Sequence, residues 1–247
     1  VMMECALPPL FVAVDTPDAD EAALIARQLS LPGAGLKLGL EFFVANGPSG
    51  IRAVQAAAPG IPIFLDLKFH DIPNTVAGAM RSVAALAPTL LTIHSSGGVG
   101  MMEAAVKAAS EAAASLGVAR PKVLAVTVLT SMDDSDLTAV GMSPPVAQQV
   151  VRLAQLAKMS GVDGVVCSAQ EIEPIRAALG PDFLLVVPGI RPAGGAVGDQ
   201  KRVVTPKVAV EAGASCLVVG RPITQADHPL QAALAILDEI NEAGALS

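Results

Sequence analysis

The chain repeats one pattern eight times: a short apolar run rich in β-branched residues, followed by an Ala-rich helical segment. Strands that alternate with helices in this way are expected to be parallel, with each helix crossing back over the sheet. Eight such units in 247 residues match a closed barrel better than an open sheet. We therefore predict an α/β fold in which residues 1–247 form a single (β/α)8 TIM barrel and one catalytic domain.

The expected strands are Leu10–Asp15, Gly35–Leu40, Ile61–Lys68, Leu90–Ser96, Lys122–Leu129, Gly164–Ser168, Phe183–Gly189 and Cys216–Gly220. The expected helices include Pro17–Leu29, Asn74–Leu86, Val99–Leu116, Pro145–Met159, Ala169–Leu179 and Pro206–Ala212.

Composition excludes several classes of function. The net charge of −7 and the absence of Trp and Tyr argue against a nucleic-acid-binding surface. Cys5, Cys167 and Cys216 lack the spacing of metal ligands, so we expect reduced, buried thiols. The first residues resemble no secretory signal, and no apolar run approaches the roughly 20 residues that a membrane span needs. A cytoplasmic location without membrane association is the expectation.

The most informative segment is IFLDLKFHDIPNT, residues 63–75. Alternation along a strand directs Asp66 and Lys68 to one side and Leu65 and Leu67 to the other. The leucine side must be buried against helices, so the two charged residues face the barrel interior, where charge is costly unless it is paired or used. Asp71 follows beyond the strand, just before a helix start.

Polar residues also follow other strands, and in a barrel all these positions open on the face where active sites are built. An alternating array of Lys37, Asp66, Lys68 and Asp71 would fix one ammonium group in place. Such a group can stabilise developing negative charge and then donate a proton, which suits a carbanion intermediate. The alternative is a purely structural ion network. The polar residues at strand ends are Asp15, Lys37, Asp66, Lys68, His94, Thr130, Arg191 and Arg221.

Segments after the seventh and eighth strands have the features of a phosphate site. Barrels often bind phosphate there through backbone N–H groups. Arg221 can grip a phosphate with its planar guanidinium group, and Gln200 can donate an amide hydrogen. The Gly-rich stretch 194–202 can fold over a bound ligand, although an ordinary surface loop is the simpler alternative.

The histidines carry a weaker signal. His94 is expected to be a structural hydrogen-bonding residue, and we assign no chemistry to His70 or His228. Two acids near Lys68 could bind Mg²⁺, but the lysines compete with the metal, so no metal site is expected. Thr130 and Ser131 could bind a substrate hydroxyl or carbonyl group.

Five motifs in order resemble the orotidine 5′-phosphate decarboxylase family in its short bacterial form. The resemblance covers nearly the whole chain, and five ordered motifs are far more specific than the DxKxxD pattern alone. The motifs are DLKFHDIPNT (66–75), VLTSM (128–132), PGIRP (188–192), GDQ (198–200) and VGRPI (219–223).

The resemblance implies cofactor-free decarboxylation of orotidine 5′-monophosphate to uridine 5′-monophosphate in de novo pyrimidine biosynthesis. Lys68 would stabilise the C6 carbanion and protonate it, and Asp66 would sit near the departing carboxylate. Lys37 and Asp15 would bind the ribose hydroxyls, with Lys37 also bridging to Asp66.

The resemblance further implies a homodimer, in which Asp71, Ile72 and Thr75 reach into the partner's site. The resemblance also implies that the pyrimidine is contacted by Thr130, Ser131 and Pro188. It implies that the 5′-phosphate is held by Arg191, Gln200, the N–H of Gly220, and Arg221.

Two alternatives remain open at this stage. One is a Mg²⁺-dependent sugar-phosphate decarboxylase or aldolase of the same barrel type, whose relatives carry Glu at the position of Lys37. A lysine there repels the metal and argues against that alternative. The other is a noncatalytic nucleotide sensor, which would not need both Asp66 and Lys68.

Overall fold

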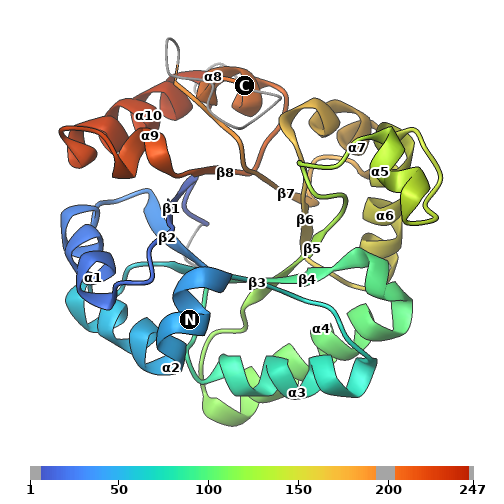
Figure 1. The fold of residues 1–247 in the computed structure, drawn as a ribbon, viewed down its shortest axis with the longest axis horizontal. Helices are drawn as coiled ribbons and strands as arrows, with labels where there is room; N and C mark the ends of the chain where they lie inside the picture. The colour runs from blue at the N-terminus through green and yellow to red at the C-terminus, as the bar shows by residue number, and fades with distance from the viewer. Residues whose placement is uncertain (1–6, 193–203, 245–247) are drawn as a thin grey trace.

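The computed structural model describes residues 7–192 and 204–244, and in this part of the chain eight parallel strands close into a barrel. Each strand pairs with its neighbours in chain order, and β8 pairs with β1 to complete the ring (Figure 1). The predicted TIM barrel is confirmed. The strands are β1 (Leu10–Val14), β2 (Ala34–Gly39), β3 (Ile63–Phe69), β4 (Leu90–His94), β5 (Lys122–Val126), β6 (Gly164–Val166), β7 (Leu184–Val187) and β8 (Cys216–Val219).

Helices surround the strands and cover the outer face of the barrel (Figure 1). Within residues 7–192 and 204–244, none of them is long and apolar enough to cross a membrane. The helices are α1 (Ala19–Gln28), α2 (Leu40–Ala57), α3 (Pro73–Ala84), α4 (Gly98–Leu116), α5 (Asp134–Ala139), α6 (Val146–Met159), α7 (Ile172–Leu179), α8 (Pro206–Glu211), α9 (Arg221–Thr224) and α10 (Pro229–Gly244), with 3₁₀ turns at Ser95–Gly97 and Ala169–Glu171.

The predicted strand positions are confirmed, but most strands end earlier than the apolar runs suggested. The run expected to end at Leu129 forms a strand only as far as Val126, and Val128 and Leu129 line a cavity instead. Helix α2 is the helical segment expected after the second strand, although no bounds were predicted for it. It contains Gly47 at φ 58° followed by Pro48, a pair that usually marks a break, and the helix is kinked there.

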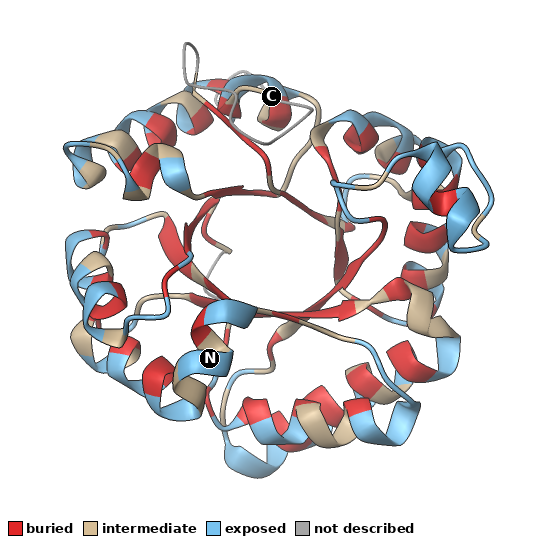
Figure 2. Cartoon of the chain, viewed as in Figure 1, coloured by how far each residue is buried: buried red, intermediate tan, exposed pale blue. Residues whose placement is uncertain are grey.

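The apolar core has two layers that follow the alternation of strand side chains. Residues such as Leu36, Leu65 and Leu67 point outward and pack against the helices. The inward layer contains Phe11 and Phe64, whose rings meet edge to face with centroids 5.7 Å apart. Figure 2 shows the ring of strands as largely buried, while the helices expose their outer faces. Side chains therefore fill the interior of the barrel, and this packed layer can form the floor of a site at one end of the strands.

Strands β6 and β7 approach so closely that a side chain at Gly164 cannot be accommodated. A Cβ atom added at Gly164 would overlap the carbonyl oxygen of Leu184, which is backbone and cannot move aside cheaply. Gly164→Ala is expected to lower the free energy of unfolding by about 1–3 kcal/mol, measured by urea denaturation. Gly244→Ala is the control, because a Cβ there meets no heavy atom within 4 Å. Equal stability of Gly164→Ala and wild type would contradict this close packing.

Candidate active site

Four charged side chains meet at the carboxyl ends of the first three strands. Lys68 Nζ lies 2.7 Å from Asp66 Oδ2, and Lys37 Nζ lies 3.6 Å from the same oxygen. Lys37 Nζ also lies 3.4 Å from Asp15 Oδ1. The structure thus brings Asp15, Lys37, Asp66 and Lys68 together as a chain of alternating charges, which we call the charged cluster.

Asp66 is the centre of the charged cluster. Only 13% of its side chain is exposed, and burial by itself disfavours a carboxylate. The positive charges of Lys37 and Lys68, together with hydrogen bonds from Lys68 and Thr92, outweigh burial and hold the pKa of Asp66 below its ordinary value. Asp66 is therefore ionised at neutral pH.

The backbone of Lys68 has an unusual conformation for a residue with a side chain. Its φ is 49°, in the left-handed region, and the pairing of β3 with β4 shifts between Leu65 and Phe69. The predicted sides of the strand are nevertheless confirmed. Leu65 and Leu67 are buried in the outer layer, while Asp66 and Lys68 form an ion pair on the inner side. The irregularity itself was not visible in the sequence pattern.

A cavity of about 230 Å³ opens beside the charged cluster. Its polar wall contains Lys37, Asp66, Lys68 and Thr130. Its other wall is apolar, so the cavity can hold a flat, partly apolar ligand against two ammonium groups. The remaining lining residues are Phe64, Val126, Val128, Leu129, Val166, Cys167, Pro188 and Val218.

Asp71 stands apart from the charged cluster within one chain. Its side chain is exposed, and Asp71 Oδ1 accepts a hydrogen bond from the N–H of Ile72 at 2.6 Å. It forms no ion pair with another described residue. Ile72 and Thr75 are also exposed, at the start of α3. Ser131 is exposed too and does not line the cavity.

The candidate phosphate-binding residues lie after β7 and β8. Arg191 is 6% exposed, and its backbone N–H donates to the Val204 carbonyl oxygen at 3.1 Å. Gly220 follows β8 directly, and Arg221 is exposed at the first position of α9. Gln200 and the Gly-rich stretch 194–202 lie outside the described residues.

Two histidines lie beside the charged cluster. The rings of His70 and His94 have centroids 5.5 Å apart and are tilted by 31°. Burial, together with the positive charges of His70 and Lys68, holds the pKa of His94 below its ordinary value, although Asp66 opposes this effect. Sequence reasoning missed this pair, because residues 24 positions apart on different elements share no motif.

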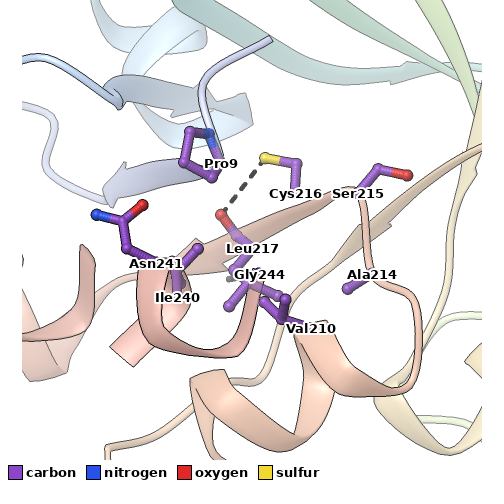
Figure 3. A pocket seen from close by; sticks show the side chains of 9 residues that line it. All are labelled: Pro9, Val210, Ala214, Ser215, Cys216, Leu217, Ile240, Asn241 and Gly244. Atoms are coloured by element: carbon purple, nitrogen blue, oxygen red, sulfur yellow. Dashed lines mark hydrogen bonds between the residues drawn. The ribbon is translucent and has the colours of Figure 1, made fainter. Parts of the chain in front are cut away.

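Other cavities lie at the opposite end of the barrel. One, of about 250 Å³, is bounded by Pro9, Cys216 and the end of α10, and Figure 3 shows uncharged side chains around it. Burial raises the pKa of the Cys216 thiol, as it does for Cys167, and both cysteines are free. Cys5 lies outside the described residues. The described residues that line this cavity include no charged side chain, in contrast to the cavity beside the charged cluster.

The described residues contain no group of three or more His, Cys, Asp and Glu side chains that could hold a metal ion. Asp15 and Asp66, the two acids of the charged cluster, both pair with the Lys37 ammonium group.

Comparisons with known proteins agree on one family. The sequence model of the "Orotidine 5'-phosphate decarboxylase / HUMPS family" matches residues 8–236. An orotidine 5′-phosphate decarboxylase of Rhodospirillum rubrum is 56% identical over 94% of both chains. One of Paramagnetospirillum magneticum is 53% identical over 94% of this chain and 98% of the relative. The crystal structure of the enzyme of that name from Lactobacillus acidophilus superimposes with a TM-score of 0.83 at 41% identity, covering 95% of this chain and 99% of the other.

The lowered pKa of His94 predicts a pH dependence of stability. Its pKa in the folded protein lies below the ordinary value of 6.5, so folding opposes its protonation. The stability that the neutral ring contributes is present above the unfolded pKa and is lost as pH falls through the folded pKa. Between about pH 8 and about pH 5, the free energy of unfolding should fall less steeply in His94→Gln than in wild type. Denaturant titrations across this range measure both slopes, and equal slopes would contradict the prediction.

Proposed function

The chain belongs to the orotidine 5′-phosphate decarboxylase / HUMPS family, and from this premise we propose how its barrel decarboxylates orotidine 5′-monophosphate to uridine 5′-monophosphate. The observation that carries the proposal is the charged cluster, in which one ionised carboxylate holds two ammonium groups at the mouth of the barrel. The reaction is a step of de novo pyrimidine biosynthesis. It proceeds without a cofactor in a single catalytic domain, and free, buried thiols suit its placement in the cytoplasm.

Lys68 carries the chemical step. The bond between C6 of the pyrimidine and its carboxyl carbon breaks, CO₂ leaves, and the electron pair stays on C6. The Lys68 ammonium stabilises this negative charge and then transfers a proton to C6, which completes the product. The contact of 2.7 Å with Asp66 supports this role, because it holds the ammonium in one position before the substrate reacts.

Asp66 acts on the other side of the same bond. An ionised carboxylate next to the substrate carboxylate raises the energy of the bound substrate, and this repulsion ends when neutral CO₂ forms. The lowered pKa of Asp66 supports the role, since only the ionised form repels the substrate and attracts Lys68. Asp66 therefore both stresses the substrate and positions the proton donor.

Contacts remote from C6 supply much of the catalytic power. The carbanion is poorly delocalised, so the enzyme must lower the barrier by roughly 20 kcal/mol, more than one ammonium group provides. In the proposal, Lys37 and Asp15 bind the ribose hydroxyls, and the phosphate contacts drive closure and positioning. The phosphate ligands are Arg191, Gln200, the N–H of Gly220, and Arg221.

The pyrimidine occupies the cavity beside the charged cluster. Thr130 and Pro188 line this cavity. Ser131, the residue after Thr130, does not line it and is proposed as a further contact of the pyrimidine. The apolar wall, with Val126 and Val166, excludes water from the reacting carbon and strengthens the electrostatic interactions there.

Each site is completed by a second copy of the chain. Asp71 is exposed and makes no ion pair within the described residues, and the neighbouring Ile72 side chain is 68% exposed. An acid and a large apolar side chain at one exposed helix start suit a contact between subunits. In the proposed homodimer, Asp71, Ile72 and Thr75 enter the partner's site.

Replacing Lys68 tests the central role. Lys68→Ala should lower kcat by at least about a thousandfold, because the variant lacks both the positive charge and the proton donor. The assay follows the loss of ultraviolet absorption of orotidine 5′-monophosphate together with CO₂ release. Lys107→Ala is the matched control, since Lys107 is an exposed lysine whose partner is Glu111 in the next turn of α4. Activity of Lys68→Ala within about tenfold of wild type would refute the assignment.

The same assay distinguishes the Mg²⁺-dependent alternative. Wild-type enzyme treated with EDTA should keep its full activity, because Lys37 lies where a metal would have to bind between Asp15 and Asp66. Complete loss of activity on chelation, restored by Mg²⁺, would favour the sugar-phosphate alternative.

Mixed dimers test the shared site. Lys68→Ala and Asp71→Ala, each inactive alone, are co-expressed with different tags, and the dimer carrying both tags is purified. Its two sites are unequal: one combines both substitutions, and the other has an intact Lys68 and an intact partner Asp71. The mixed dimer should show about half of the wild-type activity. If Asp71 acted within its own chain, the mixed dimer would stay as inactive as its parents.

A further inference from the structure

We infer that Thr92 is a positioning residue of the reaction, whose hydroxyl group locks the Asp66 carboxylate and the Lys68 backbone into their working arrangement. The inference rests on the proposed decarboxylation and deepens it. Thr92 lies on β4, its side chain is fully buried, and it belongs to none of the five sequence motifs.

Thr92 stands opposite an irregularity of β3. Leu65 pairs with Leu91 and Phe69 pairs with Ile93, so Asp66, Leu67 and Lys68 together face Thr92 alone. Extra residues on one strand cannot all join the ladder of backbone hydrogen bonds. At this point the Lys68 backbone turns into the left-handed region, which is unfavourable for a residue with a side chain.

The Thr92 hydroxyl replaces the missing ladder partner. The N–H of Lys68 donates to Thr92 Oγ1 at 2.9 Å, and Thr92 Oγ1 donates to Asp66 Oδ1 at 2.9 Å. The direction of both bonds is fixed, because an ionised carboxylate only accepts and a backbone N–H only donates. One hydroxyl group therefore connects the strained backbone of the proton donor to the carboxylate that holds its ammonium group.

As a result, the two carboxylate oxygens of Asp66 have different partners. Oδ1 accepts from Thr92, while Oδ2 lies 2.7 Å from Lys68 Nζ and 3.6 Å from Lys37 Nζ. Rotation of the carboxylate would break the bond to Thr92, so the hydroxyl group keeps Oδ2 directed toward the lysines. Without it, the carboxylate could turn and release the Lys68 ammonium from its position.

The titratable groups around Asp66 come from three strands. Lys37 approaches from β2, Lys68 from β3 and the partly buried His94 from β4, while Asp15 acts through Lys37. The hydrogen bond from Thr92 is one of the interactions that lower the pKa of Asp66. Loss of the hydroxyl group should therefore raise the pH at which Asp66 becomes protonated.

Thr92→Val tests the inference, because valine keeps the shape of threonine and removes the hydroxyl group. A hydrogen bond to a charged group justifies an expected fall in kcat of about 10- to 100-fold. KM should change by less than about threefold, since ribose and phosphate contacts are untouched. The acid limb of the kcat/KM profile should move to higher pH. Thr92→Ser, which restores a hydroxyl group, should recover most of kcat and return the acid limb toward its wild-type position.

Thr127→Val is the matched control. Thr127 is also a buried threonine, just after β5, and its hydroxyl group donates to the Val166 carbonyl oxygen at 3.1 Å, a neutral acceptor. This variant should lose stability as Thr92→Val does, yet keep the wild-type acid limb and a kcat within about threefold of wild type.

The outcomes separate the inference from the proposed function. If wild type does not decarboxylate orotidine 5′-monophosphate, the proposed function fails. If wild type is active and Thr92→Val matches Thr127→Val, with reduced stability but unchanged kcat and acid limb, the positioning role is refuted. Should Thr92→Val not fold, Thr92→Cys serves instead, because a thiol is a weak donor of similar size. An unchanged kcat in that variant would likewise refute the inference.

Discussion

The shared carboxylate of Asp66 is the interaction on which the rest of the site depends. A buried charge is unstable unless it is paired, and here one carboxylate oxygen faces two ammonium groups while the other accepts a hydroxyl hydrogen. Removing either lysine would leave two carboxylates, Asp15 and Asp66, with one ammonium group. The two lysines and Thr92 therefore hold the pKa of Asp66 below its ordinary value, and the ionised carboxylate is the form that its proposed role requires.

The barrel brings together charged side chains from different strands, which no single strand could do. Parallel strands deliver Asp15, Lys37 and Asp66 to the same end, so three short segments far apart in the chain meet without any loop holding them. Beneath them, the edge-to-face pair of Phe11 and Phe64 is buried in the barrel interior. At the irregularity in β3, the backbone N–H of Lys68 donates to the Thr92 hydroxyl group, and Lys68 Nζ lies 2.7 Å from Asp66 Oδ2.

The charged cluster and the residues proposed to bind the phosphate lie at different strands of the barrel. The charged cluster occupies β1 to β3 and the segments just after them, with Thr92 and His94 added from β4. The residues proposed to hold the phosphate follow β7 and β8. A nucleotide that spans the mouth would thus be held at one side and react at the other, so binding energy far from C6 can be used to position the reacting carbon.

The sequence by itself determined the barrel, because apolar strands alternating with helices leave few other ways to bury both faces of a parallel sheet. It also determined the meeting of Lys37, Asp66 and Lys68, since strand parity and position suffice to bring them to one mouth. It did not show the left-handed backbone at Lys68, the hydroxyl of Thr92 opposite it, or the His70–His94 pair. Those depend on the register between β3 and its neighbour β4, which no local pattern encodes. For Asp71 the sequence already placed the residue beyond the strand, and the tertiary structure adds that its side chain is exposed and forms no ion pair with another described residue. Local periodicity decides which elements form, whereas pairing between distant segments decides which side chains meet.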